Sequence, residues 1–187
     1  MSPITCATLA HISFRGFTLR AATRGFATSR PSRVQNQIYA SVRRPADFHT
    51  YQLLSTSART PLLTLWTTSW CSTCRAVAPL VRSLVEAGVG EPEGGVAFCV
   101  VEYDAPDIMA GDGVDRLGTT YVITSIPTLL SFDAGEPVLE TRVVDGRKLA
   151  DREFLVEWIR NEARRCGGDG NGGGGTGVLG GLFKGWR

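Results

Sequence analysis

Hydrophobic positions divide the middle of the chain into short apolar runs and amphipathic stretches. The runs 62–67, 96–101 and 126–132 are almost entirely apolar or β-branched, which is typical of strands buried on both faces of a sheet. The alternating segment 37–42 predicts another short strand. The segment 138–144 follows an Asp-Ala-Gly-Glu turn and predicts the hairpin partner of the run 126–132.

Helical spacing appears between these runs. The stretch 71–87 carries five apolar residues on one helical face, with a kink expected at a proline inside it: Val77, Leu80, Val81, Leu84 and Val85, with Pro79. A helix is also predicted from Pro45 toward Pro61, a short irregular helix with a loop within 104–118, and a last helix after Asp151, whose side chain can cap it. The order β-α-β-α-β-α-β-β-α predicts an α/β fold, with a mixed central sheet flanked by helices on both faces.

Charge is distributed very unevenly along the 187 residues. The net charge is only +2, but residues 1–44 hold seven arginines and no Asp, Glu or Lys, while the remainder holds 13 basic and 18 acidic residues. The positive charge therefore belongs to one end and predicts no nucleic-acid surface on the domain. Arg-rich, Ser-rich and acid-poor segments are typical of import peptides. We interpret residues 1–32 as a mitochondrial transit peptide, cut near Phe26, which directs the protein to the matrix. The alternative is a disordered basic arm that binds anionic surfaces.

The other boundaries follow from composition. More than half of residues 167–181 are glycine, so the segment 167–187 is predicted to be a disordered tail. This leaves 33–166 as one folded domain, and a hydrophobic content of 43% is sufficient for its core. No run of 18 apolar residues occurs, so no membrane-spanning segment is expected.

Two of the five cysteines, Cys71 and Cys74, are separated by two residues where a predicted strand meets a predicted helix. The first turn of a helix offers unpaired N–H groups and partial positive charge, which favour the thiolate that attacks disulfides. The spacing therefore predicts a redox dithiol. The same spacing also forms half of a zinc site. His49 stands alone outside the predicted transit peptide, however, and no metal site is expected.

Several motifs around this pair are similar to those of the thioredoxin family. Trp70-Cys71-Ser72-Thr73-Cys74 matches the spacing of the family's Trp-Cys-Gly-Pro-Cys centre, and Pro79 stands at the position of its helix-kinking proline. Ile126-Pro127-Thr128, followed by a Gly-Glu turn, resembles the family's cis-proline strand and hairpin, and Gly146 also fits. The resemblance runs from about Gln37 to Arg164 and implies a thioredoxin fold.

The resemblance also implies a function and roles for residues. The protein would be a thiol–disulfide oxidoreductase, a protein-disulfide reductase in mitochondria, with Cys71 as nucleophile and Cys74 as resolving thiol. A cis Pro127 would bring the Ile126 backbone beside Cys71, where an extended substrate peptide can pair. Trp70 would lie against the site, or else in the core. Protein disulfides are the implied substrates and a thioredoxin-reductase-type protein the electron donor, without a bound cofactor.

Some residues depart from the family pattern. The family has a buried Asp where this chain has Leu65, and a Lys where it has Val100; Ser72 and Thr73 replace Gly and Pro. A second hypothesis is therefore a non-catalytic binding or assembly module with this fold. A third is a cluster- or metal-binding protein in which two subunits share ligands from Cys71. Cys99 is expected to be an inert core residue, and Cys166 to be exposed enough for an incidental or regulatory disulfide.

Overall fold

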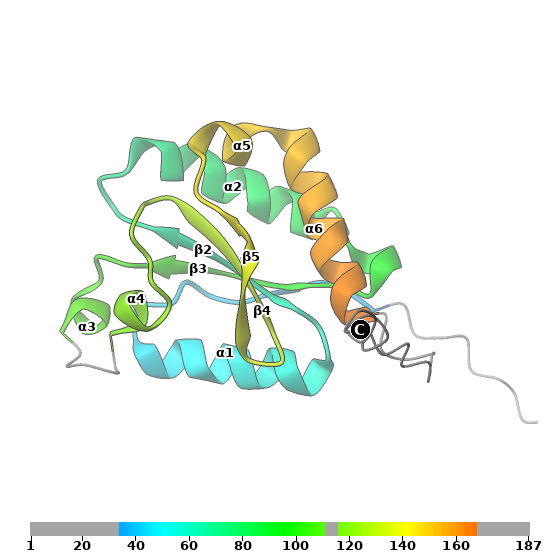
Figure 1. Cartoon of the computed structure of the whole chain (residues 1–187), viewed down its shortest axis with the longest axis horizontal. Helices are drawn as coiled ribbons and strands as arrows, with labels where there is room; N and C mark the ends of the chain where they lie inside the picture. The colour runs from blue at the N-terminus through cyan, green and yellow to red at the C-terminus, as the bar shows by residue number, and fades with distance from the viewer. Residues whose placement is uncertain (1–33, 111–115, 168–187) are drawn as a thin grey trace, which may run out of the picture. The chain divides into compact units, whose positions relative to one another are not determined.

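The computed structural model of the chain describes residues 34–110 and 116–167 (Figure 1). The predicted transit peptide and the tail from residue 168 onward lie outside the described residues. The strands are β1 (Gln37–Ile38), β2 (Leu62–Thr67), β3 (Ala97–Glu102), β4 (Thr128–Asp133) and β5 (Glu136–Val143). The helices are α1 (Pro45–Ala58), α2 (Ser72–Glu86), α3 (Pro106–Met109), α4 (Leu117–Thr120), α5 (Gly146–Ala150) and α6 (Arg152–Gly167), with a 3₁₀ turn η1 (Glu91–Glu93).

The strands form one mixed sheet in the order β1-β3-β2-β4-β5. Strands β1, β3 and β2 run parallel, and β4 and β5 run antiparallel to their neighbours. Helix α2 connects β2 to its parallel neighbour β3, because two parallel strands can be joined only by a crossover connection, which is usually a helix. The predicted α/β architecture with a mixed sheet is confirmed. Every residue of the central strand β2 is buried, which explains its continuous apolar sequence.

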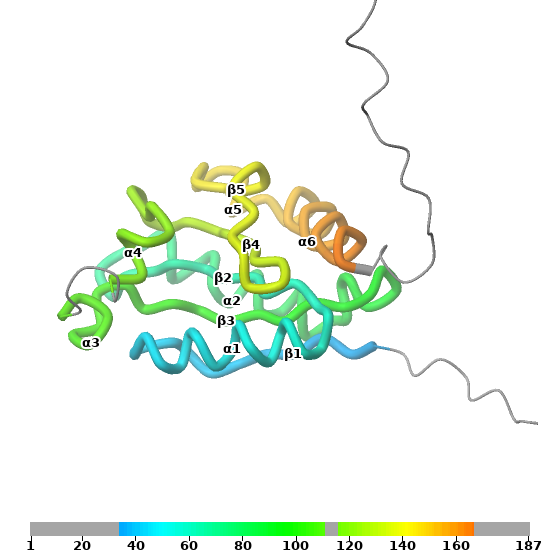
Figure 2. The backbone as a smooth tube through the Cα atoms, turned by 60° about the horizontal axis from the view of Figure 1, so that its bottom comes forward, coloured from blue at the N-terminus to red at the C-terminus, as the bar shows by residue number. Residues whose placement is uncertain are grey.

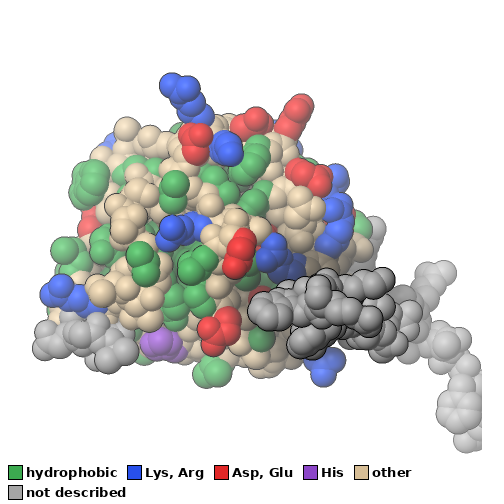
Figure 3. Space-filling model, viewed as in Figure 1, with side chains coloured by type: hydrophobic (Ala, Val, Ile, Leu, Met, Phe, Trp, Pro, Cys, Tyr) green, Lys and Arg blue, Asp and Glu red, His purple; other side chains and the backbone are tan. Residues whose placement is uncertain are grey.

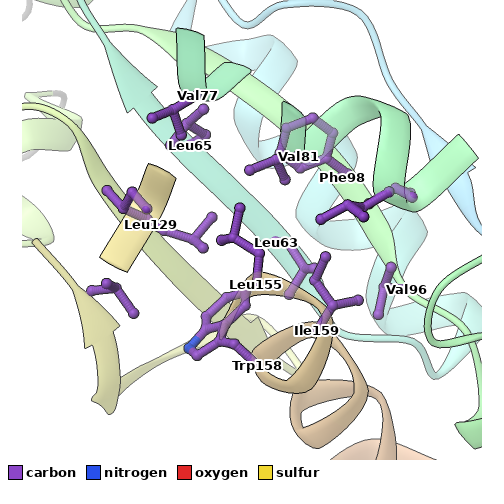
Figure 4. Packing of buried hydrophobic residues seen from close by; sticks show 14 of the residues in the cluster. Leu63, Leu65, Val77, Val81, Val96, Phe98, Leu129, Leu155, Trp158 and Ile159 are labelled. Carbon is purple, nitrogen blue, oxygen red and sulfur yellow. The ribbon is translucent and has the colours of Figure 1, made fainter. Parts of the chain in front are cut away.

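Side chains on the two faces of the sheet form two separate cores. Leu63 and Leu65 of β2 pack with α2 and α6, and Figure 4 shows Leu65 beside Val77 of α2. Leu62 and Trp66 point to the opposite face and pack with α1, α3 and α4. The alternation follows from the two-residue period of a strand. Figure 2 shows α1 on one side of the sheet and α6 on the other, so the predicted coverage of both faces is also confirmed.

Three predicted elements differ in detail. The run 126–132 enters the sheet only at Thr128, because the cis Ile126–Pro127 peptide bond turns the chain just before it. The predicted strand 37–42 is reduced to Gln37–Ile38 and a single bridge between Val42 and Val101. The predicted turn at residues 145 and 146 is the start of helix α5, where the Asp145 side chain accepts a hydrogen bond from the Arg147 N–H (2.9 Å).

The face of the molecule shown in Figure 3 carries basic and acidic side chains intermingled, with hydrophobic side chains between them. Within residues 34–110 and 116–167, no helix is both long and apolar enough to cross a bilayer. Helices α3 and α4 lie at the end of the sheet where β2 and β3 terminate (Figure 1). This end of the sheet also carries the cysteine pair.

Val122, which follows the C-cap residue Tyr121 of α4, adopts a left-handed backbone conformation (φ 52°) although it is β-branched and 55% exposed. Glycine is the usual residue at such a helix end. We expect Val122→Gly to raise the free energy of unfolding by about 1 kcal/mol, because relief of the left-handed strain exceeds the added chain entropy. Chemical denaturation measures this. The matched control is Val144→Gly, at a similarly exposed valine without positive φ, where we expect a loss of stability; a loss at both positions contradicts the strain argument.

Candidate active site

Cys71 occupies the N-cap of α2, one residue before its first turn. Its Sγ accepts a hydrogen bond from the backbone N–H of Cys74 (N···S 3.1 Å). Few sequences place sulfur at an N-cap, where Ser, Thr, Asp and Asn are preferred. Because the unpaired N–H groups and the helix dipole both favour negative charge at this point, the reduced Cys71 side chain is held where its thiolate is stabilised.

Cys71 and Cys74 form a disulfide within one helical turn, with their Cα atoms 5.3 Å apart. Cys71 is 8% exposed and Cys74 3% exposed. Cys74 is therefore the more buried sulfur, as expected, but Cys71 is less accessible than expected. The reason is its place as helix cap, with the sulfur turned back over the first turn and bonded to Cys74.

Trp70 lies beside the disulfide with 73% of its surface exposed. The interpretation of Trp70 as a core residue is therefore wrong. A large apolar side chain in this position is available to contact a macromolecule that approaches Cys71. Helix α5 flanks the other side of the cysteine loop, since a Cβ placed on Gly146 would lie 3.5 Å from Cγ2 of Thr73. Sequence reasoning did not predict this helix, although Asp145 before Gly146 is an N-cap signal.

The Ile126–Pro127 peptide bond is cis, as expected. The β2–β4 register pairs Trp66 with Thr128, so the cis-proline segment lies just past the end of the strand from which the chain leads to Cys71. The Thr128 hydroxyl donates to the Ser125 carbonyl (2.6 Å) and helps to hold this turn. The cysteines and Pro127 thus share one end of the sheet, and binding of substrate by Ile126 and Pro127 stays a prediction.

The two positions that depart from the family pattern lie together beneath this site. Leu65 and Val100 are partners in the β2–β3 register, and both are buried in the core cluster between the sheet and α2. The site therefore has no charged group at either of these positions. An apolar pair of this kind packs without the desolvation cost that a buried ion pair carries.

A cavity of about 310 Å³ reaches Cys74. Its lining is Thr67, Thr68, Ser69, Cys74, Arg75, Ala78, Val100, Glu102 and Asp104. Asp104, just after β3, accepts two hydrogen bonds on Oδ2, from the Ser69 N–H (2.8 Å) and the Ser69 hydroxyl (2.5 Å). The bond from the Ser69 hydroxyl holds the pKa of Asp104 below its usual value. Sequence reasoning missed this residue; its signal is a carboxylate at the carboxyl end of a parallel strand.

The other two described cysteines do not join the site. Cys99 is fully buried in the core on the α1 side, and burial raises its pKa, which agrees with the inert role expected. Cys166 is half-buried rather than exposed, and its Sγ donates to Asp133 (3.0 Å). Burial, together with that bond, raises the pKa of Cys166 to about 12. Among the described residues, no group of three or more His, Cys, Asp or Glu side chains could hold a metal ion.

Known proteins similar to this chain are thioredoxins. No protein-family model matches it. Two curated relatives are the chloroplastic M-type thioredoxin of Zea mays (31% identical over 112 residues, 59% of each chain) and the chloroplastic thioredoxin M5 of Oryza sativa subsp. japonica (32% over 92 residues, 49% of this chain and 46% of the relative). The chain thus spans about half of the length of the curated relatives that it matches.

Solved structures show the same fold at low sequence identity. The thioredoxin of Malassezia sympodialis superposes with a TM-score of 0.50 at 18% identity, covering 70% of this chain and 95% of that chain. Poplar thioredoxin h superposes with a TM-score of 0.50 at 16% identity, covering 67% and 96%. At these identities the likeness establishes the fold, and the expected thioredoxin fold is confirmed.

The expected mitochondrial location is contradicted by these relatives, since all three curated thioredoxins are chloroplastic. Import peptides of both organelles are rich in Arg and Ser and poor in acids. Composition therefore does not separate one organelle from the other. The described domain thus has the thioredoxin fold, carries a cysteine pair at the start of α2, and is similar in sequence to thioredoxins.

Proposed function

We propose that this protein is a thiol–disulfide oxidoreductase that reduces disulfides of other proteins through Cys71 and Cys74. The observation that carries the proposal is the Cys71–Cys74 disulfide at the N-terminus of α2, where the Cys71 sulfur accepts the N–H of Cys74. A sulfur held there is favoured as thiolate. The second sulfur lies one turn away at the distance at which a disulfide closes without backbone movement.

The reaction has two exchange steps. The Cys71 thiolate attacks one sulfur of the substrate disulfide, forms a Cys71–substrate disulfide and releases the first substrate thiolate. Cys74 then loses its proton and attacks the Cys71 sulfur, which forms the Cys71–Cys74 disulfide and releases the second substrate thiolate. The substrate gains two electrons and, in water, two protons, and the dithiol of the protein is oxidised. A reductase of the thioredoxin-reductase type returns the two electrons to the Cys71–Cys74 pair.

Substrate recognition is proposed at the exposed rim of the same site. Trp70 offers apolar surface beside the sulfur, and the Ile126 backbone before Pro127 offers hydrogen-bonding groups where the chain enters β4. An extended peptide that carries a disulfide can pair with this backbone as it would with an added strand. No bound cofactor is needed, because both electrons reside in the dithiol.

The test is the pH dependence of alkylation of the reduced protein. At pH 7 we expect iodoacetamide to modify Cys71 several-fold faster than free cysteine, because the helix terminus favours the thiolate. Mass spectrometry identifies the modified residue, and Cys166 serves as the internal control, since its raised pKa predicts little reaction. A Cys71 that reacts no faster than free cysteine would leave only the binding-module hypothesis.

A further inference from the structure

The second exchange step requires a destination for a proton. Cys74 attacks only as a thiolate, so its proton must leave from a sulfur that is almost completely buried. The two strand positions at which the family carries a charged pair, Leu65 and Val100, carry no group that can accept it. The acceptor must therefore be reached by another route.

The cavity that Cys74 lines provides a route from this cysteine to ionisable groups. Three charged side chains also line the cavity: Arg75, Glu102 and Asp104. Arg75 is a cation and accepts no proton. Glu102 is engaged by Arg43, whose Nε and Nη2 donate to its two carboxylate oxygens (2.8 and 3.2 Å).

Asp104 is held differently. Both bonds from Ser69 end on Oδ2 and fix the carboxylate at the cavity wall. The second carboxylate oxygen, Oδ1, takes part in neither of these two bonds with Ser69. A volume of about 310 Å³ holds several water molecules, and water that bridges two polar groups transmits a proton between groups too far apart for a direct hydrogen bond.

We propose that Asp104 accepts the proton of Cys74, through water in this cavity, during resolution of the mixed disulfide. The proposal rests on the proposed function. In this step the Cys74 S–H bond breaks and its proton passes along the water to Asp104. The Cys74 sulfur bonds to the Cys71 sulfur, and the Cys71–substrate S–S bond breaks with its electron pair on the substrate sulfur. That thiolate is then protonated from Asp104 or from solvent.

Asp104 contacts neither the substrate nor the reacting sulfurs and acts on Cys74 only through water, so we class it as a positioning residue. Ser69 orients the Asp104 carboxylate. The position also explains how a chain without the family's buried carboxylate completes the reaction. Asp104 lies two residues past the end of β3, on the wall of the cavity that Cys74 also lines.

The test compares Asp104→Asn with Glu102→Gln, which removes the same charge from the same cavity wall. Each reduced variant is mixed with a protein disulfide, quenched with acid, and assayed for the Cys71 mixed disulfide by mass spectrometry between pH 6 and 9.5. We expect Asp104→Asn to slow resolution about tenfold at pH 7, less than the full effect of a direct general base because the transfer runs through water. The deficit disappears toward pH 9.5, where hydroxide deprotonates Cys74. Glu102→Gln resolves at the wild-type rate.

Four results separate the possible failures. Equal resolution in Asp104→Asn and wild type at every pH, an equal loss in Glu102→Gln, or a deficit that does not change with pH would each overturn the role of Asp104. The third of these is the result of a merely structural defect. Absence of the Cys71–substrate disulfide in Cys74→Ser, where no resolving thiol removes it, would instead refute the proposed function on which the inference rests. The rate of the first step, unchanged in Asp104→Asn, shows that the variant is folded.

Discussion

Cys71→Ser is expected to reduce disulfide reduction about 1,000-fold or more, to the level of the reductant alone. A serine hydroxyl at the same N-cap still accepts the helix N–H, so the fold is retained. It does not ionise near neutral pH, however, and no nucleophile remains. The measurement is reduction of insulin disulfides with dithiothreitol as electron donor.

Cys74→Ser is expected to stop the reaction one step later. Attack by Cys71 proceeds, the mixed disulfide accumulates because the resolving thiol is absent, and dithiothreitol releases it. The adduct is absent when Cys71 is replaced as well. Cys166→Ser is the matched control, since its half-buried thiol bonds to Asp133 away from the site, and full activity is expected. Turnover that survives in Cys71→Ser would be incompatible with dithiol chemistry, and absence of any adduct in Cys74→Ser would favour a binding module.

Leu65→Asp is expected to lower the free energy of unfolding by about 3–5 kcal/mol at pH 7. Leu65 is fully buried between β2 and α2 beside Val77 (Figure 4), and the new carboxylate would be an unpaired charge in an apolar core. Burial raises the pKa of such a carboxyl in the folded state above its value in the unfolded chain, about 3.9. The folded state then binds more protons, so the penalty is least below pH 4, where the lost packing and the buried neutral carboxyl still cost stability, and it grows as the pH rises.

The partner strand provides the control for this experiment. Val100 faces Leu65 across the β2–β3 register, so Val100→Lys added to Leu65→Asp supplies an opposite charge and recovers part of the loss at pH 7. Leu65→Ala, which also removes packing, costs about 2–5 kcal/mol with no pH dependence. Urea denaturation at pH 4 and pH 7 distinguishes the variants. A penalty for Leu65→Asp that is the same at both pH values would contradict the buried-charge explanation.

Local patterns predicted most of the elements. The boundaries of β2 coincide with the apolar run 62–67, and α2 covers the stretch predicted to be helical. These predictions succeed because the two kinds of element differ in their hydrophobic pattern. A strand buried on both faces is continuously apolar, whereas a helix buried on one face has apolar residues every three to four positions. Helix α5 was predicted as a turn, because five residues are too few for a hydrophobic period and only the packing against α2 and α6 selects the helix.

The prediction of the mitochondrion failed for a different reason. An acid-poor, Arg-rich end carries information about import but little about the membrane to be crossed. The chloroplastic relatives contradict the mitochondrial prediction. The misplacement of Cys166 has a structural cause, because its partner Asp133 lies at the end of β4, 33 residues earlier in the chain.

The sequence by itself determined the strand–helix junction at Cys71 and Cys74 and the proline that precedes β4, because these depend on neighbouring residues. Tertiary structure alone decided that Asp104 and Ser69, 35 residues apart, meet at a cavity that reaches Cys74. That meeting depends on the parallel register of β2 and β3 and on small side chains such as Ala78 along the cavity wall. Contacts between distant residues arise from strand register and packing, and neither has a local period that a sequence can display.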